Sequence, residues 1–300
     1  MLPNWNIEQE MAHFQEIWCY RRSSHTEHTK ETWNERAHEW EQGLQQDAER
    51  RRRSDERVRA TADWLRSKGI LGPEQEAIDI GCGPGRFVAE FAKTARHVVG
   101  TDLSDRMLAY GERYARSIGV ENTSYVDADF QTADIDALSW RGRFDLVFSS
   151  ITPAITGKTG LEKLMAISRA WCFNSCFVNF EDALEQSLVR ELLGREPKAG
   201  WNPHWHWFYA LFNLLLLDGY FPEVTYYREE KIKTVAAGEE TARDYARRLS
   251  ESYDGAQEET LIPRIKKCLE TYSDSDGMIA YNDVIVYGWI LWDIRNRVIR

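Results

Sequence analysis

The glycine-rich stretch EAIDIGCGPGRF, residues 76–87, constrains the fold more than any other part of the chain. Its first part, 77–80, is a short apolar run with one acid, the pattern of a strand buried inside a parallel sheet. Glycines at every second position then allow a sharp backbone turn, at Gly81, Gly83 and Gly85. The following residues, 86–95, have one apolar helical face. A strand, a glycine turn and a helix start in this order predict a nucleotide-type binding site.

Three later segments have the form of a strand that ends in polar residues: HVVGTDLS (97–104), YVDADF (125–130) and FDLVFSSITPAI (144–155). A dinucleotide-binding turn has the spacing G-x-G-x-x-G, whereas this turn is G-x-G-x-G with an acid, Asp79, two residues before it. Together these elements resemble the class I S-adenosylmethionine (SAM)-dependent methyltransferases. The resemblance implies an α/β fold: a seven-stranded Rossmann-like methyltransferase sheet with helices on both faces. Strands six and seven are expected to close this sheet as an antiparallel pair.

The resemblance also implies a SAM site, with S-adenosylhomocysteine as the product. Asp102 is expected to accept hydrogen bonds from both ribose hydroxyls, because it follows the second strand. Asp79 is expected to orient the α-amino group, while the N–H groups of the three glycines face the methionine end. Leu103 and Met107 are expected beside the adenine, or else simply pack within their helix. Asp129, in preference to Asp127, is expected at the adenine amine, and Phe130 against the adenine ring. Ser149 is expected near the reacting methyl group.

The alternation of apolar patterns places the elements along the chain. Strands are expected at 77–81, 98–102, 124–126, 145–149 and 176–180, and helices at 86–95, 105–118, 135–138 and 161–171. Residues 278–293 are apolar and β-branched, which indicates a final strand pair or one long hooked strand. Because ligands bind outside the carboxyl ends of such strands, the acids at the strand ends are expected to share one crevice.

The chain is expected to consist of an N-terminal helical cap or lid (1–72) and a SAM-binding core (73–300). This core should carry helical insertions at about 183–206 and 236–276. In the cap, Trp33, Ala37 and Trp40 form one helical stripe that should be buried. We expect residues 1–53 to close over the carboxyl edge of the sheet when SAM binds; a permanently docked helix is the alternative.

The catalytic residue is left open by the sequence. Candidates for a general base are His25, His28, His204, His206 and Tyr209, although surface or interface positions are the simpler interpretation of the histidines. Trp33, Thr152 and Trp205 are expected to line the substrate pocket. The residues after the fourth strand read Ser-Ser-Ile-Thr-Pro, which lacks the N/D-P-P-Y/F motif of the amino methyltransferases that act on adenine or glutamine. No metal site is expected, because no carboxylate or cysteine lies at ligand spacing from His204 and His206.

The acidic composition limits the partners. A net charge of −10 counts against a nucleic acid and favours a small-molecule acceptor.

The longest apolar run, 207–217, is too short to span a bilayer. Five scattered cysteines and the absence of a signal segment indicate a cytoplasmic protein. The oligomeric state is not determined. Transfer or cyclisation of the aminocarboxypropyl group and a non-catalytic SAM-binding module remain alternatives, whereas the glycine spacing disfavours a NAD-dependent oxidoreductase.

Overall fold

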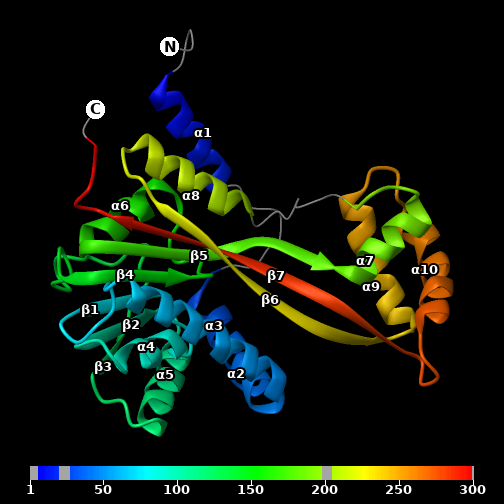
Figure 1. Ribbon diagram of the computed structural model, residues 1–300, viewed down its shortest axis with the longest axis horizontal. Helices are drawn as coiled ribbons and strands as arrows, with labels where there is room; N and C mark the ends of the chain where they lie inside the picture. The colour runs from blue at the N-terminus through cyan, green and yellow to red at the C-terminus, as the bar shows by residue number, and fades with distance from the viewer. Residues whose placement is uncertain (1–5, 20–27, 198–204, 299–300) are drawn as a thin grey trace. The chain divides into compact units, whose positions relative to one another are not determined.

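The apolar runs that follow residue 75 form the strands of one sheet, seen in a computed structural model that describes residues 6–19, 28–197 and 205–298. Within these residues seven strands lie in the order β3-β2-β1-β4-β5-β7-β6 (Figure 1). The strands are β1 (Glu76–Ile80), β2 (His97–Asp102), β3 (Thr123–Asp127), β4 (Phe144–Ser150), β5 (Ser168–Asp182), β6 (Glu223–Ala236) and β7 (Met278–Asp293).

The first five strands are parallel, with β1 hydrogen-bonded to β2 on one side and β4 on the other. In this register Asp79 lies opposite Gly100 of β2 and Phe148 of β4. A strand that is buried on both faces needs apolar side chains on both, which explains the continuous apolar run of β1. Figure 1 shows β7 running antiparallel to β5 and β6. The expected mixed seven-stranded sheet is therefore confirmed.

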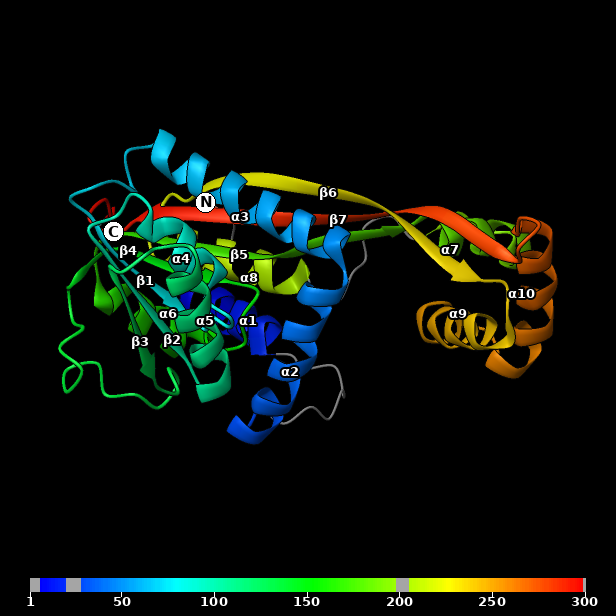
Figure 2. The same cartoon turned by 90° about the horizontal axis from the view of Figure 1, so that it is seen from below.

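Helices cover both faces of the sheet (Figures 1 and 2). One face carries α3, α4 and α5, and the other carries α1, α6 and α8. Further along the chain, α7, the π-helical turn η1, α9 and α10 complete the set. The bounds of the helices are α1 (Ile7–Cys19), α2 (Lys30–Gln46), α3 (Ala48–Ser67), α4 (Arg86–Ala92), α5 (Asp105–Ser117), α6 (Gly157–Ile167), α7 (Ala183–Leu188), η1 (Val189–Leu193), α8 (Trp205–Leu217), α9 (Glu239–Ser252) and α10 (Glu258–Tyr272).

The chain divides into two compact units. The first comprises Met1–Cys176, Pro203–Tyr227 and Gly288–Arg300, and it contains the glycine turn and the N-terminal helices. The second comprises Phe177–Asn202 and Arg228–Tyr287, and it has an apolar core of its own built from α7, α9 and α10. A separate N-terminal cap and a core with two insertions stay a prediction.

The fifth strand differs from its expected position. A helix was expected to run to residue 171 and the strand to occupy 176–180, but α6 ends at Ile167 and β5 begins at Ser168. The reason is pairing: Trp171, Cys172 and Phe173 lie opposite residues 146–148 of β4. Such pairing overrides local helix propensity. Likewise residues 135–138 form a turn instead of a helix. Residues 278–293 form one long strand, β7, the second of the two alternatives expected for this segment.

The tryptophan stripe of α2 is only partly buried. Ala37 is fully buried, but Trp40 is 44% exposed, and the guanidinium of Arg50 lies 5.6 Å from its ring centroid. The prediction that both tryptophans are buried is therefore wrong for Trp40, because α2 contacts α3 and α5 with the narrow face around Ala37. In α1, Phe14 and Trp18 join the main core, where α1 packs against α8 and α6.

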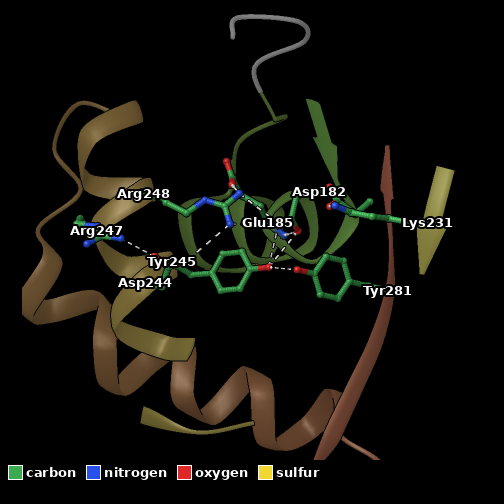
Figure 3. Close-up of polar contacts among 9 residues, drawn as sticks. Asp182, Glu185, Lys231, Asp244, Tyr245, Arg247, Arg248 and Tyr281 are labelled. Carbon is green, nitrogen blue, oxygen red and sulfur yellow. Dashed lines mark hydrogen bonds and ion pairs between the residues drawn. The ribbon is translucent and has the colours of Figure 1, made fainter. Parts of the chain in front are cut away.

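The second unit is held by a buried polar network around Asp182 (Figure 3). The Tyr245 hydroxyl donates to Asp182 at 2.9 Å and lies 2.8 Å from the Tyr281 hydroxyl. Arg248 pairs with both Asp182 and Glu185. Asp182 also caps α7 by accepting the N–H of Glu185 at 2.8 Å. Burial and the nearby carboxylate of Asp182 raise the pKa of Tyr245, which keeps this phenol protonated as a donor.

We expect Tyr245→Phe to lower the free energy of unfolding of the second unit by about 1–3 kcal/mol, because it removes a donor from a buried carboxylate. Urea unfolding, with hydrogen exchange read on α9, measures the change. Arg247→Ala is the matched control: Arg247 pairs with Asp244 at the surface, so its loss should cost little stability. Equal stability of Tyr245→Phe and the wild type would contradict the role given to the network.

Candidate functional site

The turn after β1 uses glycine for backbone conformation. Gly81 and Gly83 have φ angles of +68° and +51°, in the left-handed region that favours glycine. Their N–H groups are engaged inside the protein: Gly81 donates to the Thr101 carbonyl and Gly83 to Asp102 Oδ2, each at 2.8 Å. The N–H of Gly85 donates to the Cys82 carbonyl at 3.1 Å. The expectation that these three N–H groups face a ligand is therefore wrong.

The three glycines also differ in the space beside them. A Cβ on Gly83 would have nothing within 4 Å, so this position opens away from the protein. A Cβ on Gly81 would lie 2.0 Å from Thr152 Oγ1, and one on Gly85 would lie 2.8 Å from the Tyr125 hydroxyl. Gly81 thus admits the loop after β4, and Gly85 admits the Tyr125 ring of β3. Gly83 alone of the three leaves room for a ligand.

Asp102 stands at the end of β2 beside this open position. Its Oδ2 accepts the N–H of Gly83 at 2.8 Å, and its Oδ1 accepts the N–H of Ser104 at 2.9 Å. A carboxylate has about four acceptor positions, so these hydrogen bonds do not exhaust its capacity. Burial raises the pKa of Asp102, while the backbone N–H groups of Ser104, Gly83 and Leu103 oppose this shift. The carboxylate is therefore held by the backbone and can still accept from a further donor.

Asp79 is the most perturbed acid of the site. It is 2% exposed, and its Oδ2 has no hydrogen-bond partner among the described residues. Burial raises its pKa well above the ordinary range, and the charge of Asp102 adds to this shift. A buried carboxylate oxygen without a partner is costly unless a donor or a cation lies beside it. The pair Asp79 and Asp102 thus suits a ligand with a cationic group and adjacent hydroxyls.

In the loop after β3, the Asp129 carboxylate accepts hydrogen bonds from residues of the same loop. Asp129 accepts from the Gln131 N–H and the Thr132 hydroxyl, both at 3.0 Å. Phe130 is 2% exposed within the main core, with Lys163 Nζ 5.4 Å from its ring centroid. The expected stacking of Phe130 on a ligand ring is therefore wrong, because the segment after β3 crosses into the core.

Ser149 is also turned away from any ligand. It is fully buried; its hydroxyl donates to the Phe173 carbonyl at 3.1 Å and accepts from Asn174 Nδ2 at 2.9 Å. Its expected cofactor contact is wrong, since the hydroxyl ties β4 to β5. Met107 is buried on the inner face of α5, which supports the packing alternative, whereas Leu103 is half-buried and accessible.

Thr152 follows β4 and lies against Gly81 of the glycine turn. Its Oγ1 accepts the N–H of Ala154 at 3.1 Å. The preceding residue, Ile151, has a φ of +51°, and its N–H donates to the Ser175 carbonyl at 2.8 Å. A β-branched residue in this region is strained, and no sequence signal indicated it. The strained turn brings the Thr152 side chain to the start of the site.

The catalytic candidates are scattered. The His28 ring stacks on Trp33 with centroids 5.7 Å apart, at the start of α2. His206 and Tyr209 lie on α8, where Tyr209 is 40% exposed and its ring contacts Phe14 of α1. His25, His204 and the side chain of Trp205 lie outside the described residues. None of the candidates within the described residues is therefore assigned as a general base.

Two residues of α2, Asn34 and Lys30, contact the site although no sequence pattern indicates it. Asn34 Oδ1 accepts the Ser104 hydroxyl at 2.5 Å, and Lys30 pairs with Asp127 at the end of β3. Ser104 caps α5, a role that its place before a helix does indicate. Nothing in the sequence indicates the partner of Ser104, because Asn34 lies 70 residues earlier.

No group of three or more His, Cys, Asp or Glu side chains in the described ranges is arranged to hold a metal ion. None of the helices described here combines the length and apolar character needed to cross a bilayer.

The strand–turn–helix region matches a known family model. Residues 77–171 match the model described as a methyltransferase domain. This stretch begins in β1 and ends in β5, so it contains the glycine turn, Asp102 and Thr152.

Curated proteins match a similar part of the chain. The chain is 36% identical over 101 residues to 23S rRNA (uracil(1939)-C(5))-methyltransferase RlmD of Aeromonas hydrophila, covering 33% of this chain and 21% of that protein. It is 35% identical over 86 residues to a ubiquinone biosynthesis O-methyltransferase of Aromatoleum aromaticum, covering 28% of this chain and 34% of that protein. The matches thus span a fifth to a third of these relatives. Among solved structures, a putative methyltransferase of Bacillus halodurans aligns with a TM-score of 0.47 and 14% identity, over 78% of this chain and 98% of that one.

Proposed function

Because the chain belongs, through residues 77–171, to the class I SAM-dependent methyltransferases, we propose that it transfers a methyl group from SAM to a small-molecule acceptor. One observation carries the proposal: Asp79 Oδ2 has no partner among the described residues, close to the turn where Gly83 leaves open space. A cationic ligand at this turn would compensate the buried charge.

The residues present fit the parts of SAM. Asp102 would accept from the ribose hydroxyls, and Asp79 would hold the cationic methionine end. Leu103 would contact the adenine from the accessible side of the loop after β2. Thr152 lies against the glycine turn and would border the methyl group and the acceptor. Asp127 and Asp129 compete for the adenine amine, and both already have partners in the protein.

Methyl transfer from SAM requires the protein mainly to position the two reactants. Bound SAM supplies an activated methyl group on a sulfonium, which is a good leaving group. The chain's own residues orient the two reactants and exclude water. A general base is required only for an acceptor that arrives protonated and weakly nucleophilic. We therefore assign Asp102 and Asp79 to binding and leave proton transfer to the acceptor's own chemistry.

A small-molecule acceptor is supported by the net charge of −10, since nucleic-acid binding depends on clustered cations. The relatives include one whose name specifies rRNA and one whose name specifies O-methyl transfer in ubiquinone biosynthesis. The two names lead to different acceptors, so both are included as arms of the test.

The test is incubation with SAM carrying a labelled methyl group, in separate reactions with a metabolite extract and with total RNA. Mass spectrometry of labelled products identifies the acceptor class. S-adenosylhomocysteine as the co-product supports methyl transfer, whereas methylthioadenosine shows attack on the aminocarboxypropyl arm. SAM affinity without turnover on either extract supports a binding module, and labelled RNA would overturn the small-molecule proposal.

The affinity for SAM is expected to rise with pH. Asp79 has a raised pKa in the free protein, and a cation beside it would lower that pKa, so binding releases a proton. The gain in affinity begins above the lowered pKa of the complex and levels off above the raised pKa of the free protein. Calorimetry in buffers of different ionisation enthalpy counts the released protons. Asp79→Asn should bind more weakly and lose this proton release; an unchanged release in the variant would exclude Asp79 as its source.

The same shift predicts the pH dependence of the free protein's stability. An acid with a raised pKa stabilises the fold when protonated, and this contribution is lost as pH rises from the unfolded pKa through the folded one. Asp79→Asn should therefore raise the Tm at neutral pH relative to wild type, by a margin that shrinks in acid.

A further inference from the structure

We propose that Asn34 is a positioning residue that holds the loop after β2, residues 102–104, in its ligand-binding conformation. The proposal rests on the proposed SAM site at this loop, and it adds a role for α2 that the cofactor contacts do not include.

Asn34 contacts three successive residues at the start of α5. Its Oδ1 accepts the Ser104 hydroxyl at 2.5 Å, and its Nδ2 donates to Asp105 Oδ1 at 2.8 Å. Its backbone carbonyl lies 3.4 Å from Nη1 of Arg106. An amide side chain both accepts and donates, and here each function is used on a different residue of the same turn.

Ser104 transmits this contact to Asp102. Ser104 is fully buried, and its Oγ accepts the N–H of Met107 at 3.1 Å, so its own proton points to Asn34. The backbone N–H of Ser104 donates to Asp102 Oδ1 at 2.9 Å. A continuous hydrogen-bonded path therefore runs from α2 through Ser104 to the acid expected to bind the ribose.

Lys30 fastens the same helix at a second point. It pairs with Asp127 at the end of β3 and lies 3.8 Å from Asp105. The hydrogen bond to Asp127 raises the pKa of Lys30. This pair is exposed and contributes little by itself, but it places α2 across the ends of β2 and β3. Asn34, with its buried partner Ser104, makes the stronger attachment.

The chemistry of Asn34 predicts which replacements fail. Alanine removes both hydrogen bonds. Aspartate keeps an acceptor for Ser104 but loses the donor and places a second negative charge beside Asp105. We therefore expect Asn34→Asp to weaken the loop at least as much as Asn34→Ala. Glu35, an exposed neighbour on the same helix, provides a matched control.

The test compares Asn34→Ala, Asn34→Asp and the control Glu35→Ala. Calorimetry with SAM should show a Kd raised roughly three- to tenfold in both Asn34 variants, the scale of one hydrogen bond, and unchanged in Glu35→Ala. In turnover, the KM for SAM should rise while kcat at saturating SAM stays constant. In the free proteins, hydrogen exchange at the amides of residues 104–107 should be faster in the Asn34 variants.

The outcomes separate the two proposals. If wild type binds SAM and the Asn34 variants bind it equally well, the positioning role is overturned. A fall in kcat with constant KM would also overturn it, because Asn34 would then act in the chemical step. If wild type does not bind SAM, the proposed function fails, and the exchange of residues 104–107 alone decides: faster exchange in the variants supports the role, and unchanged exchange rejects it.

Discussion

Asp102→Ala is expected to weaken SAM binding by about 2 kcal/mol or more, roughly thirtyfold, as for hydrogen bonds to a charged group. The carboxylate is fixed at the end of β2 by backbone N–H groups and can still accept from a further donor. Isothermal calorimetry measures the loss. The SAM affinity of Asp102→Asn should lie between those of Asp102→Ala and wild type, because the amide keeps one acceptor oxygen but no charge.

This prediction requires that the Asp102→Ala variant remains folded. The Gly83 and Ser104 N–H groups lose their acceptor in Asp102→Ala, so the Tm should fall too. Circular dichroism establishes that the variant is folded at the temperature of the titration. A folded Asp102→Ala protein with wild-type SAM affinity would remove Asp102 from the site.

Gly83→Val is expected to abolish detectable SAM binding while the protein still folds. The structure has nothing within 4 Å of the Cβ position, so the new side chain meets no protein atom and projects into the space proposed for the ligand. The residue does carry backbone strain, because its φ is +51°. Titration up to millimolar SAM, with a melting curve, measures both effects.

Gly119→Val is the control that separates the effect of backbone strain from the effect of blocking the ligand space. Gly119 lies in an exposed turn after α5, has a φ of +74°, and also has nothing within 4 Å of a Cβ. Both variants should lose a similar amount of stability, but Gly119→Val should bind SAM normally. Normal binding by Gly83→Val would mean that the ligand site lies elsewhere.

Local patterns were sufficient for the first two strands, β1 and β2, and for the acids near their carboxyl ends. The apolar run before Gly81 and the acid at Asp102 mark strands by composition alone, and parallel strands bring their carboxyl ends to one edge. The sequence therefore predicted that Asp79 and Asp102 lie together. It could not predict that the glycine N–H groups donate within the protein, because their acceptors include Thr101 and Asp102 of another strand.

Side-chain direction depended on contacts that the sequence does not encode locally. Ser149 and Phe130 both follow the expected strand pattern, yet Ser149 bonds to β5 and Phe130 enters the core. For Ser149, strand register decides the side-chain direction, because a shift of one residue turns a side chain to the other face. For Phe130, which follows β3, the packing of that segment against the core decides it. The strand β5 begins earlier than expected for a related reason: its first residues take their conformation by pairing with β4.

The sequence by itself determined the class of the fold, the glycine turn and the two acids at strand ends, since each depends on residues close together in the chain. Only the tertiary structure decided which glycine leaves open space, which acid lacks a partner, and which helix supports the loop after β2. Each of these depends on segments far apart in sequence: Thr152 against Gly81, Tyr125 against Gly85, and Asn34 on Ser104. Their contacts arise from the packing of the sheet edge and its helices, which no local periodicity records.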